Sequence, residues 1–240
     1  MAALKRILRK PLTALILAAV TPLTAYAQSP PSTLDDQGTL IISQAGRPMG
    51  TEKFSIRSTS NQIQAQGEVT LRYEDSGRAV NIHTFPRLVL SSELEPVSYV
   101  WDEKSPDISH LEVDFRSSPA RSVLKKSDGK RDVREFQLRP DVVILDNNIF
   151  HHYELLVRRY LRTPGGIQAF NGFIPQEALP GGLAVADAGT AEPKVLGKQK
   201  GLRHLIVTTD TLRVDLWADD LGRLDRLLSP SAQLEVVRKK

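Results

Sequence analysis

The chain has no cysteine among its 240 residues. It therefore cannot form a disulfide, a thiolate nucleophile or a thiolate metal site. It also has no cysteine that could carry a lipid anchor at the N-terminus of a mature chain. We expect the stability of the fold to come from a packed apolar core alone.

Long apolar runs are scarce as well. The run at residues 12–20 follows four basic residues and precedes the small-residue ending Ala25-Tyr26-Ala27. This order is typical of a secretory signal peptide, and the run is shorter than the roughly 20 residues of a membrane-spanning helix. We predict that residues 1–27 are cleaved and that the product is periplasmic or extracellular, without an integral membrane segment. A retained N-terminal anchor is the alternative.

An excess of basic charge is absent from the predicted mature chain. Residues 1–27 carry four Lys and Arg and no acidic residue, so 28 basic and 28 acidic residues remain after cleavage. A neutral chain lacks the basic surface expected of a nucleic-acid-binding protein. We therefore expect no nucleic-acid partner.

Two regions are predicted beyond the signal peptide. Residues 28–36 are polar and contain Pro30 and Pro31, which is typical of a flexible leader. Residues 37–240 have a length that suits one large β-rich domain.

Alternating polarity predicts strands. In residues 63–73, small or apolar side chains occupy the odd positions and polar ones the even positions, as in a strand with one wet face. Weaker alternation recurs around Tyr99, Val113 and Val214, and glycine-containing turns lie between such segments. A strand is also expected at 167–175, a turn at Pro180-Gly181-Gly182 and a long loop or hairpin tip at 186–201. This order favours an antiparallel meander.

One segment has helical periodicity. Apolar side chains recur every three or four residues from Ile149 to Leu161, which predicts a helix over about 148–162. Asp146, Asn147 or Asn148 is the expected N-cap. The predicted fold is therefore mainly β: a curved antiparallel meander, a half-barrel or clam, with one helix on its concave face.

Two adjacent histidines are candidate metal ligands. Asp146 and Glu154 lie near His151 and His152, but adjacent helical side chains point about 100° apart, and the i, i+4 spacing of helical zinc sites is absent. We expect one histidine on the helix surface and one packed at its edge, with Glu154 paired to His151. His83, His110 and His204 fall in predicted strands and have no metal-ligand spacing. We predict no metal site and no cofactor.

Catalytic motifs are missing too. The sequence has no Gly-x-Ser-x-Gly element, which would single out a nucleophilic serine. The carboxylate pairs Asp35-Asp36 and Asp219-Asp220 fall in the leader and in a turn, where Asp stabilises local bends. We assign no catalytic residue.

Two stretches resemble uncharacterised exported families. Gly46-Arg47-Pro48-Met49-Gly50 with Thr51-Glu52-Lys53-Phe54, and the strand, acidic-Gly turn and strand over 214–230, are similar to elements of exported domains of unknown function. Those families resemble the curved antiparallel sheets of periplasmic lipoprotein carriers. The resemblance implies a sheet that half encloses helices, although carriers usually bear more than one helix.

These features favour a non-catalytic periplasmic or secreted binding protein for a lipid or another apolar envelope component. The alternatives are a structural or protein-interaction module of the envelope, and a hydrolase whose site is assembled from scattered His and Asp. Under the first hypothesis the ligand lies between the helix and the concave face of the sheet. The expected lining residues are Tyr99, Trp101, Phe115, Phe150, Tyr153 and Val157.

Overall fold

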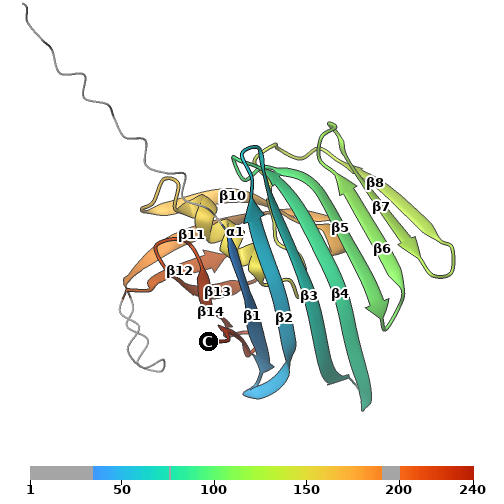
Figure 1. The fold of residues 1–240 in the computed structure, drawn as a ribbon, viewed down its shortest axis with the longest axis horizontal. Helices are drawn as coiled ribbons and strands as arrows, with labels where there is room; N and C mark the ends of the chain where they lie inside the picture. The colour runs from blue at the N-terminus through green and yellow to red at the C-terminus, as the bar shows by residue number, and fades with distance from the viewer. Residues whose placement is uncertain (1–34, 76, 191–200) are drawn as a thin grey trace, which may run out of the picture. The chain divides into compact units, whose positions relative to one another are not determined.

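The computed structural model describes residues 35–75, 77–190 and 201–240. The first eight strands follow one another along the chain and pair in that order (Figure 1). They are β1 (Asp36–Gln44), β2 (Arg47–Ser58), β3 (Gln62–Asp75), β4 (Arg78–Ser91), β5 (Pro96–Ser105), β6 (Ser109–Asp114), β7 (Ala120–Lys126) and β8 (Arg131–Phe136).

The second half begins with the two-residue strand β9 (Val143–Ile144), which leads to helix α1 (His151–Tyr160). The remaining elements are β10 (Ile167–Ile174), the short 3-10 helix η1 (Pro175–Glu177), β11 (Leu179–Thr190), β12 (Arg203–Thr208), β13 (Arg213–Ala218), β14 (Leu224–Ser229) and β15 (Leu234–Arg238).

All described strands belong to one open, curved sheet. β1 lies at its centre because it pairs with β2 on one side and with β15, from the other end of the chain, on the other. Every neighbouring pair is antiparallel except β9 and β10. β8 and β9 end the strand order and do not pair with each other, so the sheet is not closed. The predicted curved antiparallel meander is confirmed.

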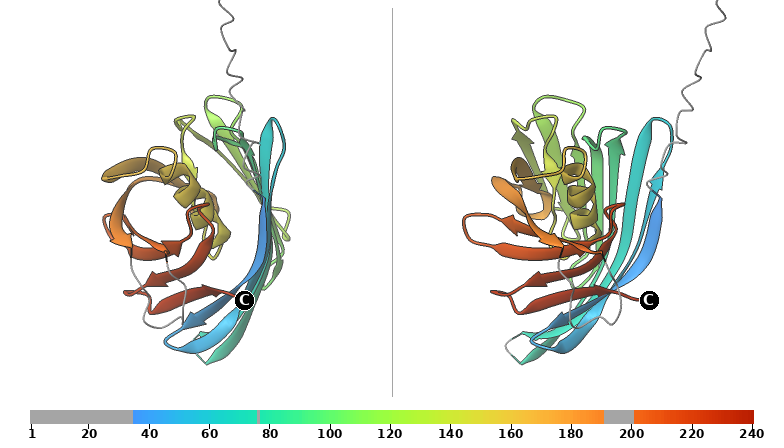
Figure 2. Two further views of the ribbon diagram at one scale, coloured as in Figure 1. Left: turned by 60° about the vertical axis from the view of Figure 1, so that its left-hand side comes forward. Right: turned by 90° about the vertical axis from the view of Figure 1, so that its left-hand side faces the viewer.

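The alternation in residues 63–73 places side chains as expected. Ile63, Ala65, Val69 and Leu71 of β3 are buried, while the polar residues between them face away from the core. Helix α1 lies inside the curve of the sheet, between the β1–β8 half and the β10–β15 half (Figure 2). The prediction of one helix on the concave face is confirmed.

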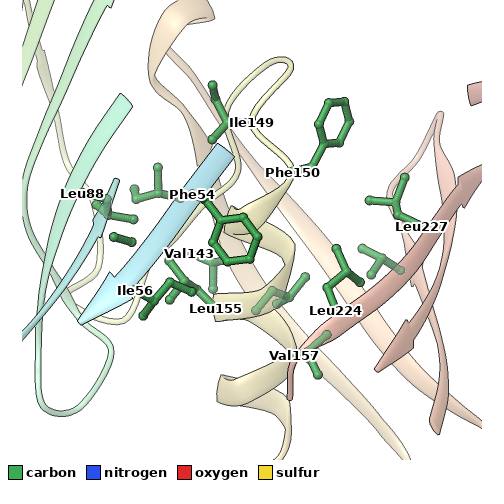
Figure 3. Close-up of a cluster of buried hydrophobic side chains, with 14 of the residues drawn as sticks. Phe54, Ile56, Leu88, Val143, Ile149, Phe150, Leu155, Val157, Leu224 and Leu227 are labelled. Carbon is green, nitrogen blue, oxygen red and sulfur yellow. The ribbon is translucent and has the colours of Figure 1, made fainter. Parts of the chain in front are cut away.

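Side chains from both halves of the sheet fill the space around α1. A single buried cluster contains Phe54 and Ile56 of β2, Leu155 and Val157 of α1, and Leu224 and Leu227 of β14 (Figure 3). Burial of apolar area at roughly 25 cal/mol per Å² is the main stabilising contribution of such a core. The apolar stripe of the helix is thus used to join the two halves.

The start of the helix differs from the prediction. The N-cap residue is Phe150, and no side chain of the expected caps accepts a hydrogen bond from the first turn. Instead, the backbone amides of Phe150 and His151 donate to the carboxylate of Glu52 in β2. The predicted N-cap is wrong because the carboxylate of Glu52, nearly 100 residues away in the sequence, accepts the hydrogen bonds of these amides.

The turn predicted at Pro180-Gly181-Gly182 is also wrong, and so is the first part of the loop or hairpin tip predicted at 186–201. Pro180, Gly181 and Gly182 lie inside β11 and pair with β10. The pairing of β11 with β12 begins only at Ala184, so Pro180 interrupts no ladder on that side. Ala186–Thr190 continues β11 instead of forming a loop, and residues 191–200 lie outside the described residues.

The predicted signal peptide, 1–27, and residues 28–34 of the predicted leader also lie outside the described residues, and β1 begins at Asp36. In the described part of the chain, no helix has both the length and the apolar character needed to cross a membrane.

Candidate functional site

Glu52 holds the N-terminus of α1 against the sheet. Its side chain is fully buried, and Oε2 accepts hydrogen bonds from the backbone amides of Phe150 (2.8 Å) and His151 (3.1 Å). Its Oε1 lies 2.5 Å from Nδ1 of His151. A carboxylate at this position satisfies free helical amides and interacts favourably with the helix dipole.

The neighbouring strand leaves room for this contact. Gly67 of β3 faces Phe54 across the β2–β3 ladder, and a Cβ at position 67 would lie 3.2 Å from both Oε1 of Glu52 and Cε1 of His151. The ring of Phe54 stacks on the His151 ring with 5.7 Å between centroids. The absence of a side chain at Gly67 therefore lets the histidine and the carboxylate meet.

Asp146 is the centre of an adjoining polar group. Its Oδ2 accepts a hydrogen bond of 2.5 Å from the Tyr99 hydroxyl, and its Oδ1 accepts from the amides of Asn147 and Gln176. Burial raises the pKa of Asp146 to about 6, and the Tyr99 hydrogen bond opposes that rise. Burial and the neighbouring carboxyl of Asp146 raise the pKa of Tyr99 well above its ordinary value.

His152 lies beside this group as a neutral imidazole. Its Nδ1 accepts a long hydrogen bond, 3.4 Å, from the amide of Asp146. Burial and the charge of His151 lower the pKa of His152 well below its ordinary value. The two imidazole rings are 4.8 Å apart between centroids.

The two histidines and three polar neighbours form what we call the buried polar cluster: Glu52, Tyr99, Asp146, His151 and His152. Four members have no exposed surface, and Asp146 is 5 % exposed. The Nε2 atoms of both histidines have no hydrogen-bond partner among the described residues. The cluster therefore brings together acid and base groups where no substrate can reach them.

The prediction for the histidine pair is wrong in position. We expected one ring on the helix surface and one at its edge, but both are fully buried because they face the sheet from the first turn of α1. Among the described residues, no group of three or more His, Asp or Glu side chains is arranged to hold a metal ion. The histidines of the strands stay apart, each beside its own carboxylate: His83 with Glu68, His110 with Asp102 and Glu112, and His204 with Asp215.

Glu154 pairs with arginines and not with His151 as predicted. Its carboxylate lies 2.5 Å from Arg158 and 2.8 Å from Arg238, and it accepts the amide of Leu224 at 3.1 Å. Burial raises the pKa of Glu154 to about 8, and the two guanidinium groups oppose that rise. Arg238 also binds Asp36 at 2.7 Å. This buried ion network ties α1 to the start of β1 and the end of β15, which lie at the same end of that antiparallel pair.

The six predicted ligand-lining residues are distributed through the core. Tyr99 and Val157 are fully buried, Trp101 and Phe150 are nearly so, and Phe115 and Tyr153 are partly buried against the same cluster. Phe115 packs edge-on against Phe173. None of the six lines either of the two pockets described next.

The larger of these pockets opens on the side of the sheet that faces away from the core. It is shallow, with a volume of about 590 Å³. We call it the outer pocket; its lining residues are Thr39, Ile41, Pro48, Met49, Gly50, Thr51, Lys53, Arg72 and Lys239. A smaller pocket of about 70 Å³ lies between β6–β8 and η1.

Sequence reasoning missed the outer pocket. The signal that could have revealed it is the uninterrupted apolar run Leu40-Ile41-Ile42 in β1. Leu40 and Ile42 are buried, so the alternation of the strand turns Ile41 outward, where it is 39 % exposed.

Comparison with known proteins gives a fold neighbour but no family. No protein-family profile and no curated protein sequence matches the chain. A β-barrel-like protein of the domain of unknown function DUF1849 from Brucella abortus superposes with a TM-score of 0.56 at 10 % identity, covering 85 % of this chain and 94 % of its own. A DUF1089 family protein from Pseudomonas aeruginosa reaches a TM-score of 0.46 at 13 % identity, covering 72 % and 86 %.

The likeness to the Brucella protein concerns the fold alone. The Brucella protein is a domain of unknown function, as the predicted resemblance to such families implies, and it is not described as a lipoprotein carrier. The chain is thus similar in fold to a β-barrel-like protein of unknown function, and fold alone assigns no activity.

Proposed function

We propose that the protein is a non-catalytic binding protein of the cell envelope, exported to the periplasm or beyond, which binds an apolar envelope component on the outside of its sheet. The observation that carries this proposal is the outer pocket, where Ile41 and Pro48 are exposed and the partly buried Met49 completes the apolar lining. Small-molecule sites are concave and mostly apolar, with a few polar groups that orient the ligand.

The interior is a less favourable place for a ligand. A ligand between α1 and the sheet would have to displace side chains such as Leu155 and Val157, which already pack in the core. It would also separate Glu52 from the first turn of the helix. Carriage of the kind found in lipoprotein carriers would therefore require α1 to leave its position.

A hydrolase receives little support. Its candidate groups, His151, His152 and Asp146, do lie close together, but they are buried between α1 and the sheet. A general base must come within hydrogen-bond reach of its substrate, and the burial of these side chains prevents that.

The proposal is tested with protein purified from its own envelope. Native mass spectrometry should detect a retained lipid, and a hydrophobic fluorescent probe should bind the emptied protein. Ile41→Asp should reduce probe binding at least tenfold, whereas Ile108→Asp, at an isoleucine that is 64 % exposed outside the outer pocket, should not. A protein that emerges bare and takes up no probe contradicts the proposal. Export is contradicted by a cellular protein whose N-terminus is still Met1.

A second candidate function is partner binding through a strand edge. β9 pairs with β10 only at Gly172 and Phe173, so Ile167–Asn171 has no strand on that side among the described residues. The segment is uncharged, and Ile167 is 77 % exposed. By contrast, the edge strand β8 carries four charged residues in six, a common protection against strand pairing.

Such an edge accepts an extended segment of another protein by main-chain hydrogen bonding. Cross-linking in the native envelope should then trap a partner at β10. Ala169→Lys should abolish the cross-link and Ala169→Ser should preserve it. Equal cross-linking by both variants contradicts this second function.

A further inference from the structure

The outer pocket combines apolar surface with cations that have no acidic partner. Lys53, Arg72 and Lys239 line it together with Ile41 and Met49. None of the three cations forms an ion pair within the described residues, although ion pairs are numerous elsewhere on this sheet, for instance between Arg87 and Asp102. Uncompensated positive charge beside apolar surface is complementary to a molecule that is both anionic and apolar.

Strand register places two of the cations in one row. The amide of Lys239 donates to the carbonyl of Thr39, and Thr39 pairs with Lys53. Lys239, just beyond the end of β15, thus lies beside Thr39 of β1 and Lys53 of β2, with about 5 Å between adjacent strands. Two flexible ammonium groups on either side of one threonine can reach a single anionic group.

The next positions along the strands supply the apolar part. Ile41 pairs with Thr51 one step further along the same face, followed by Pro48 and Met49 at the irregular start of β2. Gly50 lets the strands come close there, because a Cβ at position 50 would overlap the carbonyl oxygen of Thr70, far inside van der Waals contact. The lining of the outer pocket therefore has a cationic end at Lys53 and Lys239 and an apolar end at Pro48 and Met49.

The acidic residue opposite Lys53 pairs with a histidine and not with the cations of the outer pocket. Glu68 lies opposite Lys53 on β3, but its carboxylate lies 3.0 Å from His83 on the far side. Arg72, also on β3, adds a third positive charge beside the apolar end.

We propose that the outer pocket binds a single-chain anionic amphiphile, with its headgroup at Lys53 and Lys239 and its hydrocarbon chain along Ile41 and Met49. This inference rests on the proposed function and names the chemical class of its ligand. A neutral amphiphile would gain the apolar contact alone, and a free anion would gain the charge contact alone. Affinity should therefore require both parts on one molecule.

The test uses the mature full-length protein and monomeric probes of equal chain length: dodecyl phosphate, dodecyl maltoside and dodecyltrimethylammonium. Titration calorimetry at low salt should give a Kd for dodecyl phosphate at least tenfold below that of the other two. Because exposed charges are screened by salt, this preference should shrink at 0.5 M NaCl. Inorganic phosphate should not compete at equal concentration.

Variants locate the site. The double variant Lys53→Ala with Lys239→Ala should weaken dodecyl phosphate binding at least tenfold and leave dodecyl maltoside binding unchanged. Arg131→Ala removes an exposed cation of the distant strand β8 that forms no ion pair with another described residue, and it should change neither. Circular dichroism spectra confirm that each variant is folded.

The outcomes separate the inference from the proposed function. Equal affinity for all three amphiphiles would overturn the anionic preference while leaving apolar binding intact. Absence of binding to any amphiphile would overturn both. Competition by inorganic phosphate alone, or binding only to vesicles containing phosphatidylglycerol and not to the monomeric probe, would also overturn the proposal of a single-molecule site.

Discussion

Replacing Glu52 should show how strongly the buried polar cluster fastens the helix to the sheet. Glu52→Ala removes the acceptor for two backbone amides, at 2.8 and 3.1 Å, and the partner of the His151 ring at 2.5 Å. Each buried polar group left without a partner costs about 1–3 kcal/mol. For these three groups we expect a loss of about 3–9 kcal/mol in the free energy of unfolding, a large part of the roughly 5–15 kcal/mol of a typical domain.

A conservative variant separates hydrogen bonding from charge. Glu52→Gln keeps an oxygen that can accept from both amides and gives up the negative charge at the helix N-terminus, a contribution of about 0.3–2 kcal/mol. It should therefore cost clearly less than Glu52→Ala. Glu68→Ala is the control, because this partly exposed carboxylate forms its one ion pair within the described residues with His83 and should cost at most about 1 kcal/mol.

Urea unfolding followed by circular dichroism measures these differences, with equal slopes showing that the same surface is exposed on unfolding. The reasoning is refuted if Glu52→Ala loses less than about 1 kcal/mol, or if it is no more destabilised than Glu68→Ala.

Three further predictions concern the same contacts. Gly67→Ala should cost about 1–3 kcal/mol in urea unfolding, because the added Cβ would be overpacked against Glu52 and His151. Gly181→Ala should be close to neutral, because a Cβ there has no neighbouring described atom within 4 Å. Equal effects of the two variants would contradict the steric explanation. Arg238→Met should cost about 3–5 kcal/mol because it removes the cationic partner of the buried carboxylates of Glu154 and Asp36. In thermal unfolding its Tm should be well below that of Arg226→Met, because the partner of Arg226, Glu235, is 40 % exposed. Burial lowers the pKa of His152 in the folded protein, so its contribution to stability is present above pH 6.5 and is lost as the pH falls toward the folded-state pKa, by up to about 1.4 kcal/mol per pH unit. Between pH 6.5 and 4.5, His152→Phe should therefore lose free energy of unfolding less steeply than the unaltered protein. Equal pH slopes, measured by urea unfolding at each pH, would contradict the burial of a neutral imidazole.

Local patterns made the secondary structure largely predictable. The period-two alternation of residues 63–73 and the three-to-four spacing from Ile149 to Leu161 depend only on which face is buried, and both appear as expected in β3 and α1. Glycine turns such as Ser127-Asp128-Gly129 likewise lie between paired strands.

Long-range partners were not predictable from one sequence. Nothing local to Glu52 indicates that it will cap a helix 98 residues away, and nothing local to His151 and His152 indicates that both will face the sheet. Pro180-Gly181-Gly182 has the composition of a turn, but its position beside β10, beyond the end of the β12 ladder, permits a strand. These errors share one cause, since tertiary contacts decide what a local preference leaves open.

The outer pocket was not predicted for a related reason. Tyr99 and Phe150, which are predicted to line a ligand site, are buried in the core. The outer pocket depends on the register of β15, β1 and β2. Lys239 and Lys53 come to lie on either side of Thr39 only when the C-terminal strand β15 pairs with β1.

The most direct test of surface binding is a two-dimensional NMR titration of the mature protein with dodecyl phosphate below its aggregation concentration. Binding at the outer pocket predicts shifts at the amides of Thr39, Ile41, Thr51 and Lys53, with the amides of α1 unchanged. Shifts centred on Tyr99, Phe150 and Val157 would place the ligand in the interior and contradict the account.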